Sequence, residues 1–258
     1  MTTVVTSTNI EPVVLNKQKG ACAPTGGHEY SMKRSEINAA IKEMEQMIKD
    51  HGFEIPPFCK WTLADWEDKN HEYDEIRDNM LGWDITDYGL GDFEKTGFSL
   101  ITIRNGNQQM KDEYPKPYAE KLLMVRDGQY APMHYHAYKM EDIINRGGGN
   151  VLITVYNKGE GEEFADTDVT IKSDGRTYTV PAGTAVRLTP GESITIEQFV
   201  YHDFNVEAGT GAVLLGEVSM CNDDNTDNYF YEPIGRFPAI EEDEPAYRLL
   251  CNEYPTAK

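Results

Sequence analysis

The sequence predicts an all-β protein, an antiparallel sandwich or barrel with a helical extension at its N-terminus. From residue 97 onward, short apolar segments alternate with turns rich in Gly, Pro, Asp and Asn. Short strands at such spacing are typical of sandwiches and barrels. Before residue 97, apolar residues repeat at helical spacing instead. The chain of 258 residues is 39% hydrophobic and 10% aromatic, enough to bury a sizeable core.

The first part of the chain divides into an arm and a helical extension. Residues 1–27 end in GACAPTGG and show no periodicity, so we expect an N-terminal arm. Residues 28–96 form the predicted extension. Its first helix is expected near residues 37–48, where four apolar side chains recur at helical spacing, and Gly52 would end it.

A second helix is expected to begin at Thr62, which forms a capping-box-like pair with Asp65, and to end at Gly82. Neither helix could form a core alone. We therefore expect both to pack on the barrel.

The barrel is expected over residues 97–258. SDGR is a hairpin signal, and NGN, VPAG and TPGE mark further turns. The Pro-rich, acidic C-terminal stretch is expected to wrap over the barrel. The predicted strands are FSLITIR, AEKLLMVRD, NVLITVYN, DVTIKS with RTYTV, TAVRLTP, ESITIEQF and GAVLLGEVS.

The net charge of −20 and the pI near 4.6 argue against nucleic acid or an anionic membrane surface as partner. No segment approaches the roughly 20 apolar residues of a membrane span. The N-terminus lacks the basic start and apolar core of a secretory signal. Four well-separated cysteines, Cys22, Cys59, Cys221 and Cys251, fit reduced thiols in a cytoplasmic protein.

The segment PMHYHAYKME contains candidate metal ligands. His134 and His136 share one face of a strand, because side chains alternate. Glu141 could join them only if a bend or a new strand intervenes, and His202 would come from another strand. Three imidazoles and a carboxylate suit divalent Mn, Fe, Co, Ni or Zn. Alternatively, the H-x-H pair is accidental and faces solvent. His28, His51 and His71 are interpreted as surface or cap residues.

The spacing of these residues resembles that of a known family. Gly128, His134, His136, Glu141 and Gly148 are separated by five, one, four and six residues. They match the first signature motif of the cupins along its whole length. The resemblance implies a small double-stranded β-helix, or jelly-roll, barrel.

The second cupin motif is only partly present. Gly191 and His202 fall where the motif requires them. Glu197 and Phe199 replace its usual proline and glycine, and Asn205 stands one residue early. The departure concerns the turn before His202 more than its role as a ligand.

Longer segments closely resemble the cupin-type D-lyxose isomerases. They include KMEDIINRGGGNVLITVYN, YHDF, GEVSMCNDDNTDNYFYEPIGRFPAIEEDE and LLCNEYP, and the resemblance runs from about residue 58 to the C-terminus. It implies an aldose–ketose isomerase that uses Mn²⁺. The implied substrates are D-lyxose and D-xylulose, and D-mannose and D-fructose. It also implies a homodimer.

Such a reaction moves a proton between C1 and C2 through a metal-stabilised enediol, with a carboxylate as base. Glu232 in YEPIGRFP is the first choice for the base, because its apolar neighbours would raise its pKa by partial desolvation. A structural salt bridge with Arg236 is the alternative on sequence alone, and the resemblance favours catalysis. Arg236 is also a candidate for binding substrate.

Other charged residues are candidates for the sugar pocket. Lys139, between two ligand candidates, must lie near the ion, although strand lysines mostly point to solvent. The resemblance places Lys121 in the pocket, where composition alone favours an outward lysine. Asp243 could hold a sugar hydroxyl or belong to a solvated acidic run. Glu217 is a pocket candidate that could also orient a ligand histidine. Asp224 and Asp227 are expected to make turns.

Three rival functions are considered. A cupin-type phosphosugar isomerase would need a basic cluster for the phosphate, and no such cluster accompanies the motif. A non-catalytic sugar-binding cupin would not need a base beside the ion. An iron-dependent oxygenase would need an arginine site for an oxoacid cosubstrate, and none stands out.

Overall fold

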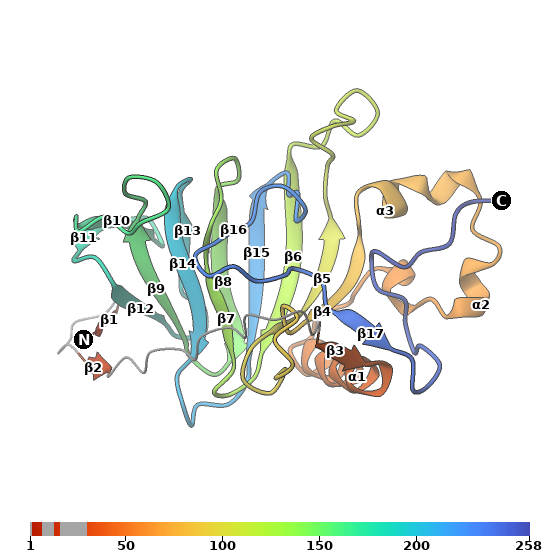
Figure 1. Cartoon of the computed structure of the whole chain (residues 1–258), viewed down its shortest axis with the longest axis horizontal. Coiled ribbons are helices and arrows are strands. Elements are labelled where there is room, and N and C mark those ends of the chain that lie inside the picture. Colours follow the sequence, from red (N-terminus) through yellow and green to blue (C-terminus); the bar gives the residue numbers. More distant parts are fainter. Residues whose placement is uncertain (1, 7–12, 16–29) are drawn as a thin grey trace.

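The computed structural model describes residues 2–6, 13–15 and 30–258. Two β-sheets make up most of it, in the all-β architecture that the sequence predicts (Figure 1). The predicted arm lies outside the described residues except for two short strands. The first sheet contains, in order, β16 (Tyr229–Phe230), β7 (Tyr130–Tyr135), β14 (Val200–Val206), β9 (Val151–Asn157), β12 (Thr184–Leu188), β1 (Thr2–Thr6) and β2 (Val13–Leu15).

The second sheet includes the strand that begins at the candidate metal ligand Glu141. Its order is β11 (Arg176–Val180), β10 (Val169–Ser173), β13 (Ser193–Ile196), β8 (Glu141–Gly148), β15 (Val213–Met220), β6 (Tyr118–Val125), β5 (Phe98–Arg104) and β4 (Gly82–Thr86). The SDGR hairpin is confirmed: Ser173 pairs with Arg176, and Asp174 and Gly175 both have positive φ. Only a turn of this hand matches the twist of the two strands.

The inward side chains of both sheets meet in one hydrophobic core. Buried and more exposed positions alternate along β8, because successive side chains point to opposite faces. The core draws Leu123, Ile143 and Leu215 from one sheet and Val155, Val186 and Phe204 from the other. The candidate site lies between the same two sheets.

The first predicted helix is confirmed as α1 (Arg34–Asp50). Its apolar face packs on Leu122 and Met124 of β6, which point away from the barrel interior. The prediction of one continuous second helix from Thr62 to Gly82 is wrong. Thr62 and Asp65 do form a capping box, but α2 (Leu63–Trp66) is short. The short 3₁₀ helices η1 (Pro57–Lys60) and η2 (His71–Tyr73), and α3 (Asp74–Asp78), make up the rest of the region.

The interruption after α2 has a local cause. The side chain of Asn70 accepts a hydrogen bond from the backbone N–H of Glu72 and so starts a new helical turn. The division of the chain at residue 97 remains a prediction. In the structure, β4 from the predicted extension already belongs to the second sheet.

The C-terminal segment crosses the strands in Figure 1 and then packs on the helices. β17 (Ala239–Glu241) pairs in parallel with β3 (Ser31–Lys33). The buried Arg34 forms ion pairs with Glu242 and Glu253, 2.6 Å from the first. Most of the predicted wrap therefore covers the helical extension.

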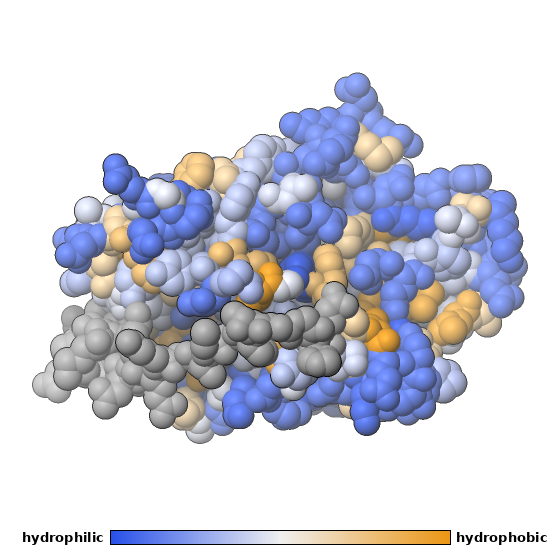
Figure 2. Space-filling model, in the orientation of Figure 1, coloured by the Kyte–Doolittle hydropathy of each residue, from blue (hydrophilic) through white to orange (hydrophobic). Residues whose placement is uncertain are grey.

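The surface agrees with the acidic composition. Figure 2 shows one face on which the loop above β5 and the helical end are largely hydrophilic. None of the helices in the described part of the chain has the length and apolar character of a membrane span. Cys59, Cys221 and Cys251 are buried free thiols, and Cys22 lies outside the described residues.

Candidate metal centre and active site

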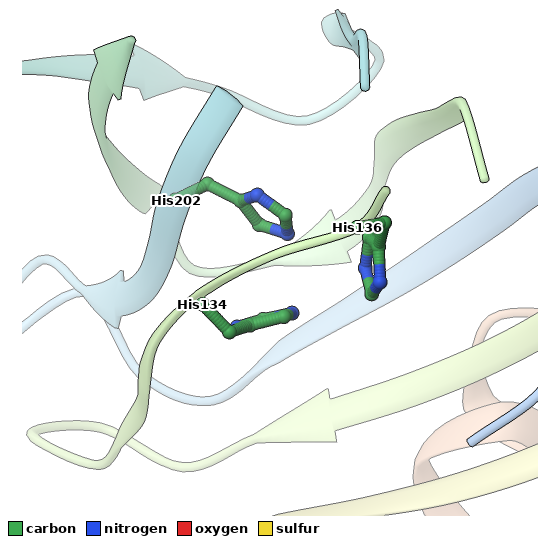
Figure 3. Close-up of side chains that lie close together, drawn as sticks. All are labelled: His134, His136 and His202. Atoms are coloured by element: carbon green, nitrogen blue, oxygen red, sulfur yellow. The ribbon is translucent and has the colours of Figure 1, made fainter. Parts of the chain in front are cut away.

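Three histidines, from two neighbouring strands and the loop that follows one of them, meet inside the barrel. His134 on β7 pairs directly with His202 on β14, and His136 follows two residues after His134. All three are buried, and each offers a ring nitrogen within 4.8 Å of the others. Figure 3 shows the rings gathered around a common space. The H-x-H pair is therefore not solvent-facing.

Backbone carbonyls fix the orientation of the three rings. Because a carbonyl only accepts a hydrogen bond, each Nδ1 must carry a proton, and in the neutral form of each ring Nε2 then keeps its lone pair. The Nδ1 atoms of His134, His136 and His202 lie 2.8, 2.6 and 3.0 Å from the carbonyl oxygens of Pro132, Asp227 and Val200. Metal-binding histidines are commonly oriented by such bonds.

Glu141 reaches the same space because a new strand, β8, begins at this residue. Its Oε1 lies 3.0 Å from Nε2 of His202, and its Oε2 lies 3.6 Å from Nε2 of His136. Among the residues that the structure describes, the buried Nε2 atom of His202 has no hydrogen-bond partner. An orphaned nitrogen facing a carboxylate fits a site for a cation, so this donor set suits a divalent metal ion.

The pKa shifts of His134, His136 and Glu141 favour the protonation states that bind a metal. Burial and the neighbouring imidazoles hold the pKa of His134 well below its usual value. Burial and the ammonium of Lys139 also lower the pKa of His136. Burial would raise the pKa of Glu141. The ammonium of Lys139 and the contacts with His136 and His202 outweigh burial and hold that pKa well below its usual range. Neutral imidazoles and an ionised carboxylate are the forms that coordinate metals.

A row of buried charges of alternating sign extends from Glu141 across the pocket. Sheet register contributes to it, because Lys121 on β6 and Glu217 on β15 are paired residues. In order the row is Glu141, Lys139, Glu217, Lys121, Asp224, Arg236 and Asp84. The nitrogen–oxygen distances between successive members are 2.6, 2.8, 3.6, 3.6 and 3.7 Å as far as Arg236, and Arg236 then donates a hydrogen bond to Asp84. We call these seven residues the charge row.

The charge row carries one net negative charge when all its members are ionised. Burial alone would lower the pKa of Lys139, but the neighbouring carboxylates raise it. Burial likewise opposes the ionisation of Asp224, but Lys121 and Arg236 lower its pKa. Each cation thus has an acidic partner, which buried charges require. Three cations do meet here, contrary to the sequence expectation of no Lys/Arg cluster, but none provides surplus positive charge.

The charge row faces an apolar wall across a pocket. Beside six of its seven members and two of the histidines, the pocket lining includes Tyr88, Phe98, Leu100, Leu123, Phe204, Asn228 and Phe230. A few placed polar groups opposite apolar side chains are typical of small-molecule sites. The row can exchange hydrogen bonds with several hydroxyl groups of one ligand.

Most of the sequence candidates meet in this pocket. Lys121 and Lys139 point inward and are about 2–3% exposed. Glu217 is also buried, and its Oε1 accepts a hydrogen bond from Lys139 instead of contacting a histidine. Arg236 lines the pocket, and no hydrogen-bond partner for its buried Nη1 occurs in the described ranges of the chain.

Two candidates lie elsewhere. Glu232 is exposed, so the desolvation expected for a base is absent, and it does not line the pocket. Arg236 pairs with Asp84 and Asp224 instead of Glu232. Asp243 is exposed and accepts hydrogen bonds from the backbone and hydroxyl of Ser35 at the start of α1. The structure therefore does not place Asp243 in the sugar pocket.

Sequence reasoning missed three acidic residues. Asp84 and Asp224 belong to the charge row, and Asp227 holds the loop after β7. Acidic residues in a run such as NDDNTDN are usually turn formers, and no local signal marks them as buried. The doubtful turn before His202 is also resolved. Phe199 has φ 61, the left-handed conformation that suits the motif's glycine.

Comparisons with known proteins identify the family of the chain. The D-lyxose isomerase family model matches residues 32–254. A D-lyxose/D-mannose isomerase of Escherichia coli O157:H7 is 46% identical, covering 86% of this chain and 98% of that protein. One from Serratia proteamaculans is 43% identical with the same coverage.

The solved structures show the same fold at low sequence identity. The L-ribose isomerase of Acinetobacter sp. DL28, solved with L-ribose, superposes with a TM-score of 0.56 at 15% identity. The match covers 83% of this chain and 99% of that one. The predicted cupin fold is confirmed, and the chain belongs to the D-lyxose isomerase family of aldose–ketose isomerases.

Proposed function

We propose that the chain is a metal-dependent isomerase that interconverts D-lyxose and D-xylulose, and D-mannose and D-fructose. The names of the two enterobacterial relatives support these sugars. The observation that carries the proposal is the convergence of three oriented imidazole nitrogens and Glu141 beside a buried row of acid–base groups. A cytoplasmic homodimer acting on free monosaccharides is part of the proposal.

We propose that His134, His136, Glu141 and His202 hold the ion. Mn²⁺ is the first choice from the family resemblance, with Co²⁺, Ni²⁺, Fe²⁺ and Zn²⁺ as alternatives that the donor set also accepts. When bound, the ion would polarise the carbonyl and hydroxyl oxygens at C1 and C2 and so acidify the C–H bond between them.

Glu217 replaces Glu232 as our choice for the base. Its Oε1 accepts a hydrogen bond from Lys139 at 2.8 Å, whereas no hydrogen bond from the described part of the chain reaches its Oε2. This second oxygen is therefore available to take a proton from one carbon and return it to the next. Lys139 is suited to stabilise negative charge that develops on a substrate oxygen, because it is already ordered by two carboxylates.

The other end of the charge row is suited to bind the remaining sugar hydroxyls. Lys121 and Arg236 supply donors, and Asp224 supplies acceptors, along one wall of the pocket. The unpartnered Nη1 of Arg236 can donate to a sugar oxygen. In this role Arg236 keeps the substrate-binding function predicted from the sequence.

The two closest rivals fit less well. A phosphorylated sugar would need basic groups that are free to pair with its phosphate, and each cation of the charge row is already paired with carboxylates. A sugar-binding module would have no need for a buried carboxylate with a free oxygen beside a metal centre. An isomerase accounts for both features.

The test begins with protein stripped of metal by a chelator. With D-lyxose or D-mannose it should form ketose only after Mn²⁺ is restored. Glu217→Gln should retain the metal and lose most turnover, a loss of at least about 100-fold for a proton-transfer group. Glu232→Gln is the matched control and should stay active. Ketose without any metal, or a fully active Glu217→Gln, contradicts the proposal. Light scattering tests the dimer.

A further inference from the structure

Asp227 makes four hydrogen bonds to the loop that joins β7 to β8. Its Oδ1 accepts from the backbone N–H groups of Ala137 and Tyr138, and its Oδ2 accepts from that of Lys139, each at 2.9 Å. Its own carbonyl oxygen lies 2.6 Å from Nδ1 of His136. Asp227 is 6% exposed, so these bonds are shielded from water.

This loop supplies two groups of the proposed site. His136 is a proposed metal ligand, and Lys139 holds both Glu141 and Glu217. We propose that Asp227 is a positioning residue that sets the direction of His136 and the place of Lys139 together. This inference rests on the proposed metal centre.

The segment that carries Asp227 also contributes to the sugar end of the pocket. Asp224 and Asn228 line the pocket, and the amide of Asn228 donates to the carbonyl and carboxylate of Asp224. Asp227 thus links the loop between β7 and β8, which carries His136 and Lys139, to the segment that contains Asp224 and Asn228. A change at Asp227 should weaken both the binding of the metal and the binding of the sugar.

The geometry explains why a carboxylate is required at this position. Three N–H groups point at two oxygens, and both oxygens are used. An asparagine has one oxygen, so in either orientation its NH₂ group would face at least one backbone N–H. Asp227→Asn therefore keeps the size of the side chain while it removes the charge and at least one of the three hydrogen bonds to the loop.

The first experiment measures metal affinity directly. Metal-stripped wild type, Asp227→Asn and Asp227→Ala are titrated with Mn²⁺ against a chromophoric chelator. We expect both variants to bind roughly 10- to 100-fold more weakly, as is typical when a group that orients a ligand is lost. Asp127→Asn is the matched control and should bind as wild type, because Asp127 is exposed and accepts its hydrogen bonds from the backbone N–H of Gly209, away from the site. In the reloaded enzyme, the KM of Asp227→Asn for D-lyxose should rise while that of Asp127→Asn does not.

Two results would overturn the inference. The first is an Asp227→Asn variant whose melting temperature falls while its Mn²⁺ affinity is unchanged, because Asp227 would then stabilise the fold without positioning the metal ligands. Rapid hydrogen exchange of the amides of residues 137–139 in the metal-free wild type would show that the loop is not held in advance, and this measurement needs no variant. If the wild type itself binds no Mn²⁺, the proposed metal centre fails, which is a distinguishable outcome.

Discussion

Replacing Lys139 by methionine removes the cation of the charge row that lies beside the proposed metal ligand Glu141. Its Nζ lies 2.6 Å from Glu141 and 2.8 Å from Glu217, and the residue is only 3% exposed. Breaking such a buried pair typically costs about 3–5 kcal/mol, because the remaining charge stays desolvated. In a chain of this size that corresponds to a fall in melting temperature of roughly 10 °C.

A bound divalent ion would offset part of this loss. It would bring positive charge to Glu141, which the methionine variant leaves without its ammonium partner. Saturating Mn²⁺ should therefore stabilise Lys139→Met by more than it stabilises the wild type. Chemical denaturation of both proteins, with chelator and with Mn²⁺, measures the two differences.

The matched control is Lys172→Met, which breaks a half-exposed ion pair with Glu197. Surface pairs contribute about 0–1 kcal/mol, so this variant should stay close to wild type. If metal-free Lys139→Met also remains within about 1 kcal/mol of wild type, the charge row does not stabilise the protein as the contacts imply.

Three further predictions concern stability and the outlying candidates. Acidification from pH 7 to 5 should destabilise the metal-free protein. The pKa values of His134 and His136 are lowered in the folded state, so below about pH 6.5 the unfolded chain binds protons that the folded protein does not. An unfolding free energy that stays constant over this pH range contradicts the prediction. Asp243→Asn should leave the KM for D-lyxose unchanged, since Asp243 contacts Ser35 instead of the pocket; a raised KM would return it to the site. Gly175→Ala should cost about 1–2 kcal/mol in the unfolding free energy, because φ there is +83.

The parts of the fold that follow from neighbouring residues could be predicted. Short apolar segments bounded by turn residues identified strands such as β5 and β9, and Asp174 with Gly175 identified a hairpin. The helix near residues 62–82 was wrong because Asn70 starts a new turn, and side-chain competition of this kind outweighs apolar periodicity.

The same distinction holds for the site. His134, His136 and Glu141 come from one short segment, so their spacing was sufficient to suggest a common ion. The charge row was not predictable, because sheet register and a crossing C-terminal segment bring Asp84, Lys121 and Arg236 together. For Glu232, apolar neighbours in the sequence suggested burial, but its side chain points outward and is exposed. Local composition does not determine which side of a segment is covered.

The two ends of the pocket are built on different kinds of backbone. Three of the four proposed ligands, His134, His202 and Glu141, stand on strands within the paired sheets, whereas Asp224 and Arg236 stand on irregular chain outside them. Irregular segments tolerate substitution and small insertions better than paired strands do. A mutant library confined to residues 222–226 and 232–238 leaves Asp227 and the proposed metal ligands unchanged. Such a library should therefore vary which sugar the pocket binds while the proposed metal site is kept. Diversification of substrate range in this scaffold should concentrate there.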